Sequence, residues 1–224
     1  MAWFPLALRA SVPDAPAVDL VLLFDGLNGM EPYLQGTRFT GIHPQDQVAL
    51  VTFTEKSRVR RNFTNQPEEL QKAVARSSVR IGPSVLRKRK QEMHLFQALV
   101  DAAGLFTGPA DARKRAILLV YGHEQPHTPV PRFEEVREAL AAAQVRLYAI
   151  AVRHYQWQYP PPPGVQTPPT IPGRYPPVKT NLAELPVETR RAVTALAEAS
   201  GGESSAGSWD FSTVLKRIRN SVRP

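Results

Sequence analysis

The sequence contains no cysteine, which excludes disulfides, thiolate catalysis and zinc–thiolate sites. It also has no apolar run close to the roughly 20 residues that a membrane-spanning helix needs. Acidic residues are scarce, 20 against 28 lysines and arginines, so the formal net charge is +8 and anionic partners are favoured. The apolar residues 3–8 are too few for a signal peptide and lack a basic flank. The compartment is left open: exported or periplasmic if the true start lies upstream, otherwise cytoplasmic.

The chain has enough apolar residues for one sizeable core, because 42% of its 224 residues are hydrophobic. We expect a single domain over residues 18–224 after an N-terminal extension of residues 1–17. Residues 155–178 are rich in proline and cannot form a helix or an interior strand. They are predicted to be an extended insertion in that domain.

One stretch, VDLVLLFDGLNG at residues 18–29, anchors the prediction of the fold. Its apolar run ends in a carboxylate, Asp25, and then turns through glycines, as in a strand that is buried on both faces. Sites of open α/β sheets lie at that end of such strands. An aspartate there can equally cap the next helix, so its position alone leaves both roles open.

The remaining pattern alternates strands with helices. Further strands are predicted at residues 47–54, 57–63, 116–121 and 145–152, and helices at residues 67–76, 93–106, 133–143, 187–200 and 210–222, with short helical turns within residues 30–41. Asn65 is the expected N-cap of the first full helix. Val59 and Phe63 alternate with arginines, as in an edge strand with one solvated face. The pattern predicts a doubly wound α/β fold: a mostly parallel central sheet with one antiparallel edge strand and helices on both faces.

Six stretches follow one another in order along the chain: VDLVLLFD, HPQDQVALVTFTEKSRVRRNFT, HLFQALVDAAGLF, ARKRAILLVYGHE, VRLYAIAVR and LAEASGGE. In order and spacing they resemble a von Willebrand factor type A domain, in particular the bacterial form labelled VWFA-related. The resemblance implies a Rossmann-like fold and adhesion-type binding of a protein. It also implies Mg²⁺ or Mn²⁺ at a metal-ion-dependent adhesion site.

The resemblance assigns the residues of that metal site one by one. Asp25 matches the first acid, Leu27 and Gly29 stand where two serines are expected, Met93 stands at the threonine, and Tyr121 replaces the second aspartate. One carboxylate cannot hold a divalent ion against its hydration, and the leucine and the methionine offer no oxygen. We therefore expect a degenerate site and no metal cofactor.

A rebuilt metal site from Asn28, His94 and Glu124 is the less favoured alternative, because scattered polar residues on loops are usually solvated. His123, Glu124 and His127 lie in GHEQPHTP, where Pro126 forbids the helical geometry of a zinc hydrolase. We expect a polar loop there.

The expected function is non-enzymatic protein binding without a divalent metal, at loops following the first and fourth strands and near residues 91–94. The expected contact residues are Asn28, Met30, His94, His123 and Glu124, joined by Trp157 and Tyr159 of the proline-rich insertion, whose rings suit a partner groove. The insertion can equally be a variation without consequence. The sequence names no partner and predicts no oligomeric state.

Two alternative functions remain open. A hydrolase using Asp25 is disfavoured because DGLNG lacks a second acid and an obvious lysine partner. An anion-binding module would use the RKRK run at residues 87–90 with basic residues at 58–61, 113–115 and 216–219. Aromatic residues are not interleaved with these runs, so nucleic acid is a less favoured partner than protein.

The connection after the first strand is short. About 20 residues join Asp25 to Asp46, too few for the long helix that the resemblance implies there. We therefore expect one face of the sheet to be thinly covered and to expose an apolar patch.

Overall fold

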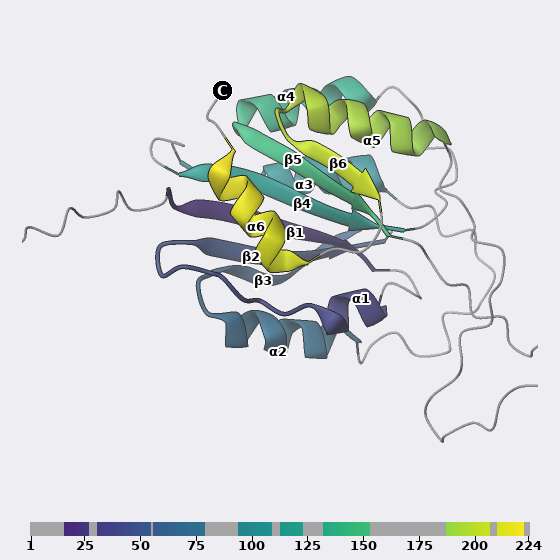
Figure 1. Ribbon diagram of the computed structural model, residues 1–224. Coiled ribbons are helices and arrows are strands. Elements are labelled where there is room, and N and C mark those ends of the chain that lie inside the picture. The colour runs from purple at the N-terminus through teal and green to yellow at the C-terminus, as the bar shows by residue number, and fades with distance from the viewer. Residues whose placement is uncertain are drawn as a thin grey trace, which may run out of the picture.

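The computed structural model describes residues 16–26, 31–54, 56–78, 94–108, 113–122, 132–152, 187–206 and 210–221. These residues form a six-stranded sheet in the order β3-β2-β1-β4-β5-β6 (Figure 1). The strands are β1 (Val18–Asp25), β2 (Gln47–Phe53), β3 (Ser57–Thr64), β4 (Lys114–Tyr121), β5 (Val145–Ala151) and β6 (Glu203–Ala206). The helices are α1 (Glu31–Gly36), α2 (Pro67–Ser78), α3 (Leu95–Ala103), α4 (Arg132–Ala142), α5 (Val187–Ala199) and α6 (Phe211–Asn220).

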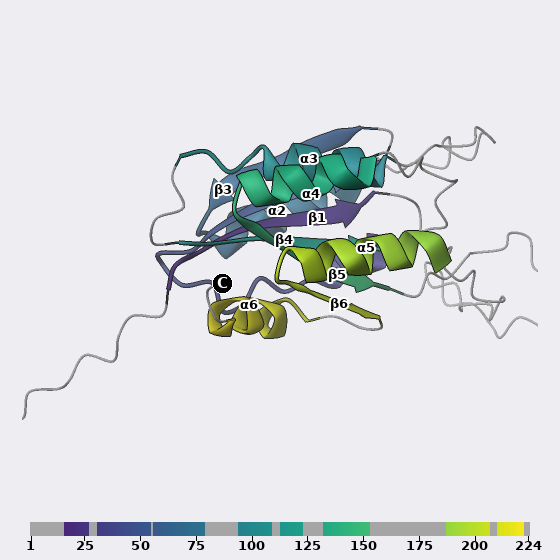
Figure 2. The same ribbon diagram turned by 90° about the horizontal axis from the view of Figure 1, so that it is seen from above.

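The pairing of the strands confirms the predicted fold class. Every neighbouring pair is parallel except β2 and β3, which are antiparallel with β3 at the edge. Helices α3, α4 and α5 cover one face of the sheet and α1, α2 and α6 cover the other, as Figures 1 and 2 show. The proline-rich insertion and the N-terminal extension lie outside the described residues, except for residues 16 and 17.

Strand β1 contributes to the core on both faces. Val21 and Leu23 belong to the cluster under α3, α4 and α5, whereas Leu20, Leu22 and Phe24 belong to the cluster under α1, α2 and α6. All five side chains are fully buried. The continuous apolar run is thus explained by its central place between β2 and β4.

The alternation predicted for β3 is only partly right. Phe63 packs on the core, with its ring 5.6 Å from that of Phe106 between centroids. Val59, in contrast, is 47% exposed. The pairing with β2 shifts register between Val48 and Leu50 and again between Leu50 and Val51. Each shift inserts an extra residue into β3, so a strict alternation of faces is lost.

Asn65 does not cap α2 as predicted. Its side-chain nitrogen donates to the carbonyl of Pro44 at 2.8 Å. The turn is instead closed by Thr64, whose hydroxyl oxygen accepts from the backbone N–H of Gln66 at 3.2 Å. Pro67 then opens the helix, where its missing N–H is not needed. The asparagine thus ties two loops together.

The C-terminal part holds one unpredicted strand. The sequence of β6, ESSA, has no apolar alternation and pairs in parallel with β5 at the sheet edge. The preceding helix ends as predicted at two glycines: Gly201 has φ +73°, and the N–H of Gly202 donates to the carbonyl of Ala197 at 2.8 Å. Asp210 caps α6 by accepting from the N–H of Thr213 at 2.8 Å.

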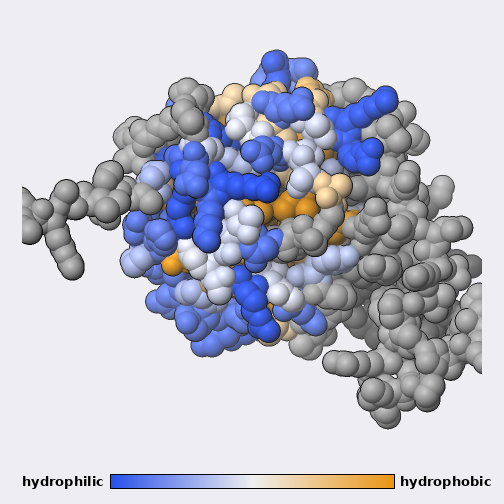
Figure 3. Space-filling model, viewed as in Figure 1, coloured by the Kyte–Doolittle hydropathy of each residue, from blue (hydrophilic) through white to orange (hydrophobic). Residues whose placement is uncertain are grey.

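The expected apolar patch is not found among the described residues. Helix α6 crosses the face that was predicted to be thinly covered, and Phe211 meets the ring of Phe39 edge-on at 5.3 Å. Figure 3 views this face: most of its described surface is hydrophilic or neutral, and a small hydrophobic area shows near its centre. Val59, on β3, is the one large hydrophobic side chain that the described residues expose. None of the described helices is long and apolar enough to cross a membrane.

A buried carboxylate joins the amino ends of the central strands to α6. Asp46, which is fully buried, accepts from the N–H of Val18 at 3.0 Å and from that of His43 at 2.7 Å. It also pairs with Arg219, which is 8% exposed and donates to the carbonyl of Gly41 at 2.7 Å. Each partner comes from a different part of the chain, so this cluster holds β1, the turn before β2 and α6 in one arrangement.

Basic residues at the start of β4, which the anion-binding alternative would use at the surface, bind groups within the molecule. Arg113 donates to Asp19 at 2.6 and 2.8 Å, and Lys114 donates to the carbonyls of Arg219 (2.5 Å) and Ser221 at the end of α6. Arg115 donates to backbone carbonyls, among them that of Gly108 at 2.7 Å. These side chains stabilise the fold. The RKRK run lies outside the described residues.

Replacing Arg219 by alanine is expected to lower the free energy of unfolding by about 3–5 kcal/mol, because it leaves the buried Asp46 carboxylate without its counter-charge. The exposed Arg217 on the same helix is the control: its pair with Glu203 is 3.6 Å long and solvated, so Arg217→Ala should cost less than about 1 kcal/mol. Urea unfolding followed by circular dichroism measures both values. Equal, small losses in the two variants would contradict the role of the buried pair.

Candidate functional site

The candidate site lies where β1 and β4 end side by side. Strands β2 and β3 are added on one side of β1, and β4, β5 and β6 on the other, so the order in which strands are added reverses between β1 and β4, which are themselves parallel. Ligands of doubly wound sheets bind at the carboxyl ends of strands beside such a switch point. Asp25 ends β1, and Tyr121 ends β4. We call the edge formed by the carboxyl ends of β1, β2, β4 and β5 the rim.

Asp25 is held at the rim by a close approach of β1 and β2. Its side chain is only 1% exposed. The next residue, Gly26, donates its N–H to the carbonyl of Phe53 at 2.8 Å. A Cβ on Gly26 would lie 3.0 Å from that oxygen and 3.3 Å from Cγ2 of Thr54, which is tighter than ordinary Cβ contacts, so the neighbouring atoms would have to shift. The glycine therefore allows the two strand ends to meet.

His94 is brought to the same rim through the backbone. Its N–H donates to the carbonyl of Thr54, just after β2, at 3.2 Å, and its own carbonyl accepts from Ala98 at 2.8 Å. It occupies the N-cap position of α3, but its imidazole makes no capping bond. The half-buried side chain thus stands at the beginning of α3 beside the end of β2. Thr54 was not among the predicted site residues; its place at the end of an apolar β-strand was the available signal.

Tyr121 lies in an apolar environment. Its side chain is fully buried among residues under α3, α4 and α5, and its hydroxyl has no hydrogen-bond partner among the described residues. Burial raises the pKa of Tyr121 from 10.0 to about 12, and the positive charge of Arg190 opposes that rise. The phenol is therefore neutral at any physiological pH.

Most of the other predicted site residues lie outside the described residues: Leu27, Asn28, Gly29, Met30, Met93, His123, Glu124, Trp157 and Tyr159. Their described neighbours along the chain are Gly26, His94, Gly122 and Val152. The N–H of Val152 donates to the carbonyl of Tyr121 at 2.9 Å. Four segments thus leave or join the rim, as expected from the order of the strands.

Across the residues that the structure describes, no group of three or more histidine, aspartate or glutamate side chains is placed to hold a metal ion. Among the predicted site residues that the structure describes, Asp25 carries a carboxylate and His94 an imidazole, the groups that usually bind metal ions.

No protein-family model matches this chain, and no curated protein matches it. Among solved structures, it is similar to the conserved hypothetical protein BatB from Bacteroides thetaiotaomicron, with a TM-score of 0.60 at 15% identity over 91% of this chain and 96% of that one. It is also similar to an aerotolerance-related membrane protein from Bacteroides fragilis, with a TM-score of 0.58 at 16% identity over 91% and 98%.

A third similar structure is proximal thread matrix protein 1 from the mussel byssus, described with a zinc-occupied MIDAS motif. The TM-score is 0.53 at 13% identity, over 92% of this chain and 48% of that one. At these identities the likeness concerns the arrangement of strands and helices. It agrees with the fold that the sequence resemblance implied.

Tyr121→Phe should leave the free energy of unfolding at neutral pH unchanged or slightly higher, because it removes a buried hydroxyl that lacks a described partner. The two proteins should differ more clearly in how their free energy of unfolding depends on pH. The folded pKa of about 12 lies above the unfolded value of 10.0, so the native chain loses stability as the pH rises from 10 towards 12, by up to about 1.4 kcal/mol per unit.

The phenylalanine variant should lack that component of the loss. Denaturant unfolding of both proteins between pH 9 and 12 measures the difference. Parallel curves over this range would show that the phenol is not shielded from solvent.

Proposed function

We propose that this chain, a domain with the fold of a von Willebrand factor type A domain, binds a protein partner at its rim without a divalent ion and catalyses no reaction. The observation that carries the proposal is the buried, neutral phenol of Tyr121 at the strand end where the resemblance expects a carboxylate. The sheet presents rigid strand ends, and the segments that leave them are suited to contact a partner.

The residues present do not fit the divalent ion that the resemblance implies. Mg²⁺ and Mn²⁺ prefer several carboxylate, hydroxyl and water oxygens in one shell. Asp25 supplies a carboxylate, but Tyr121 is held neutral in an apolar cluster. In the sequence, Leu27, Gly29 and Met93 add no oxygen from a side chain. The proposed binding is therefore independent of metal.

The proposed contact surface is built around His94 at the start of α3. This half-buried residue is bonded through its backbone N–H to Thr54, just after β2. The segments that contain Asn28 and Met30, and His123 and Glu124, follow directly on Gly26 and Gly122. Trp157 and Tyr159 follow β5 within the proline-rich insertion, and their rings would add contact area at a low entropic cost.

Two observations support this function over its rivals. A hydrolase would need a second group beside Asp25, yet this carboxylate is 1% exposed and has no described cluster of acids or histidines around it. An anion-binding surface at the predicted basic runs would need their side chains free, yet Arg113, Lys114, Arg115 and Arg219 of those runs are engaged within the fold. Protein binding requires neither a second catalytic group beside Asp25 nor free basic side chains in these runs.

Millimolar Mg²⁺ or Mn²⁺ should leave the melting temperature of the protein unchanged, because ligand-linked stabilisation requires a site in the folded state. The matched variant carries Leu27→Ser, Gly29→Ser and Met93→Thr, which restore three of the missing oxygens. Its melting temperature should rise with the metal if the backbone still follows the resemblance. A clear rise in the natural sequence would contradict a metal-independent site.

Partner binding can be tested by placing a photo-crosslinking amino acid at position 94 or 123. We expect both positions to capture the same protein from an extract of the source organism, equally with Mg²⁺ and with a chelator. The control position is Arg191, an exposed residue of α5, which should capture nothing in common with them. Capture that disappears in the chelator, or that is identical at position 191, would overturn the proposal.

A further inference from the structure

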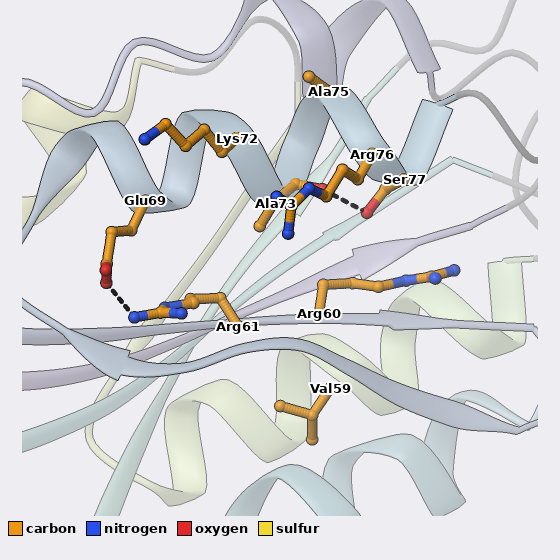
Figure 4. Close-up of a pocket in the computed structure, with 9 residues that line it drawn as sticks. All are labelled: Val59, Arg60, Arg61, Glu69, Lys72, Ala73, Ala75, Arg76 and Ser77. Atoms are coloured by element: carbon orange, nitrogen blue, oxygen red, sulfur yellow. Dashed lines mark hydrogen bonds and ion pairs between the residues drawn. The ribbon is translucent and has the colours of Figure 1, made fainter.

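A groove runs between the edge strand β3 and helix α2 (Figure 4). Its volume is about 800 Å³, and its lining comes from these two elements alone. It is separate from the rim residues Asp25, His94 and Tyr121, none of which lines it. The groove therefore belongs to the side of the sheet rather than to the candidate site.

The groove is strongly basic. Four of its lining residues are lysine or arginine, and one, Glu69, is acidic. Glu69 is already neutralised: it pairs with Arg61 and accepts from the hydroxyl of Thr64 at 2.8 Å. Lys72 and Arg76 are exposed on α2 and form no hydrogen bond or ion pair with another described residue. The positive charge of the groove is thus left for an anionic ligand.

A bulge in β3 explains why two successive arginines line one groove. Arg61 pairs with Leu50 and Val59 pairs with Val51, so Arg60 is the extra residue between them. A regular strand would place Arg60 and Arg61 on opposite faces. Here both lie on the side facing α2 and extend in opposite directions along the groove, while Val59 points away (Figure 4). Arg60 is held by a 2.7 Å bond from its Nε to the hydroxyl of Thr52.

The same strand offers a backbone edge. Strand β3 is the outermost strand at one end of the sheet: one of its edges pairs with β2, and the other pairs with no described strand. Edge strands can pair with a further strand unless charge or shape prevents it. The arginines of β3 repel a second copy of this basic strand, but they do not repel an acidic one. The charge thus selects the kind of strand that can add here.

We propose that the β3–α2 groove docks an extended acidic segment of a partner protein, which adds to β3 as a strand and places its carboxylates on Lys72 and Arg76. Main-chain pairing supplies affinity in this mode, and side-chain contacts supply specificity. A nucleic acid is the weaker candidate, because no aromatic side chain lines the groove for stacking on bases. This site is independent of the function proposed for the rim.

The test uses fluorescence anisotropy of a labelled peptide with alternating glutamate and valine, titrated with the full chain. The peptide should bind, and its affinity should fall as salt is raised. Replacing alternate peptide N–H groups by N-methyl groups keeps the charge but blocks strand pairing, and should weaken binding by about tenfold. Lys72→Glu with Arg76→Glu should weaken binding by a similar or larger factor.

The matched control is Arg191→Glu with Lys216→Glu, the same change in charge at exposed residues of α5 and α6, which should change affinity less than about twofold. If the reversed pair in the groove fails to fold, the neutral pair Lys72→Gln with Arg76→Gln replaces it and should still weaken binding. Three results would overturn the proposal: no binding of the peptide, no effect of N-methylation, or equally tight binding of an oligothymidylate of the same charge.

Discussion

The buried Asp46 carboxylate is the interaction on which the arrangement of the described elements most depends. It accepts hydrogen bonds from the N–H groups of Val18 and His43 and pairs with Arg219. These residues begin β1, precede β2 and end α6, so the first and last parts of the described fold are joined at one point. Because both charges are shielded from solvent, the pair is effective only while all its partners are in place. Lys114 adds to the same joint by binding the carbonyls at the end of α6.

The two ends of the sheet therefore have different roles. At the amino ends of the strands, charged residues such as Asp46, Arg113, Arg115 and Arg219 satisfy one another or backbone carbonyls, and they contribute to stability. At the carboxyl ends, the chain leaves the sheet in several segments around Asp25, His94 and Tyr121. Functional sites of doubly wound sheets are concentrated at this second end.

The side edge of the sheet adds a third kind of surface. Bulges in β3 turn Arg60 and Arg61 to the same side and expose Val59. In a regular edge strand without a bulge, the side chains of Arg60 and Arg61 would lie on opposite faces of the sheet. The local irregularity of β3 thus contributes to the strongly basic groove between β3 and α2.

The sequence by itself determined the central strands, the parallel order and the edge position of β3, because continuous apolar runs and alternating patterns depend only on which faces are buried. It also predicted Tyr121 as the last residue of β4, where the resemblance expects an aspartate. Only the tertiary structure decided the roles of Asn65, the formation of the polar strand β6, the bulges of β3 and the internal use of Arg113, Arg115 and Arg219. Several of these features depend on partners far away along the chain: Asp46 and Arg219, for example, are 173 positions apart. No local pattern of the sequence encodes a contact over such a separation.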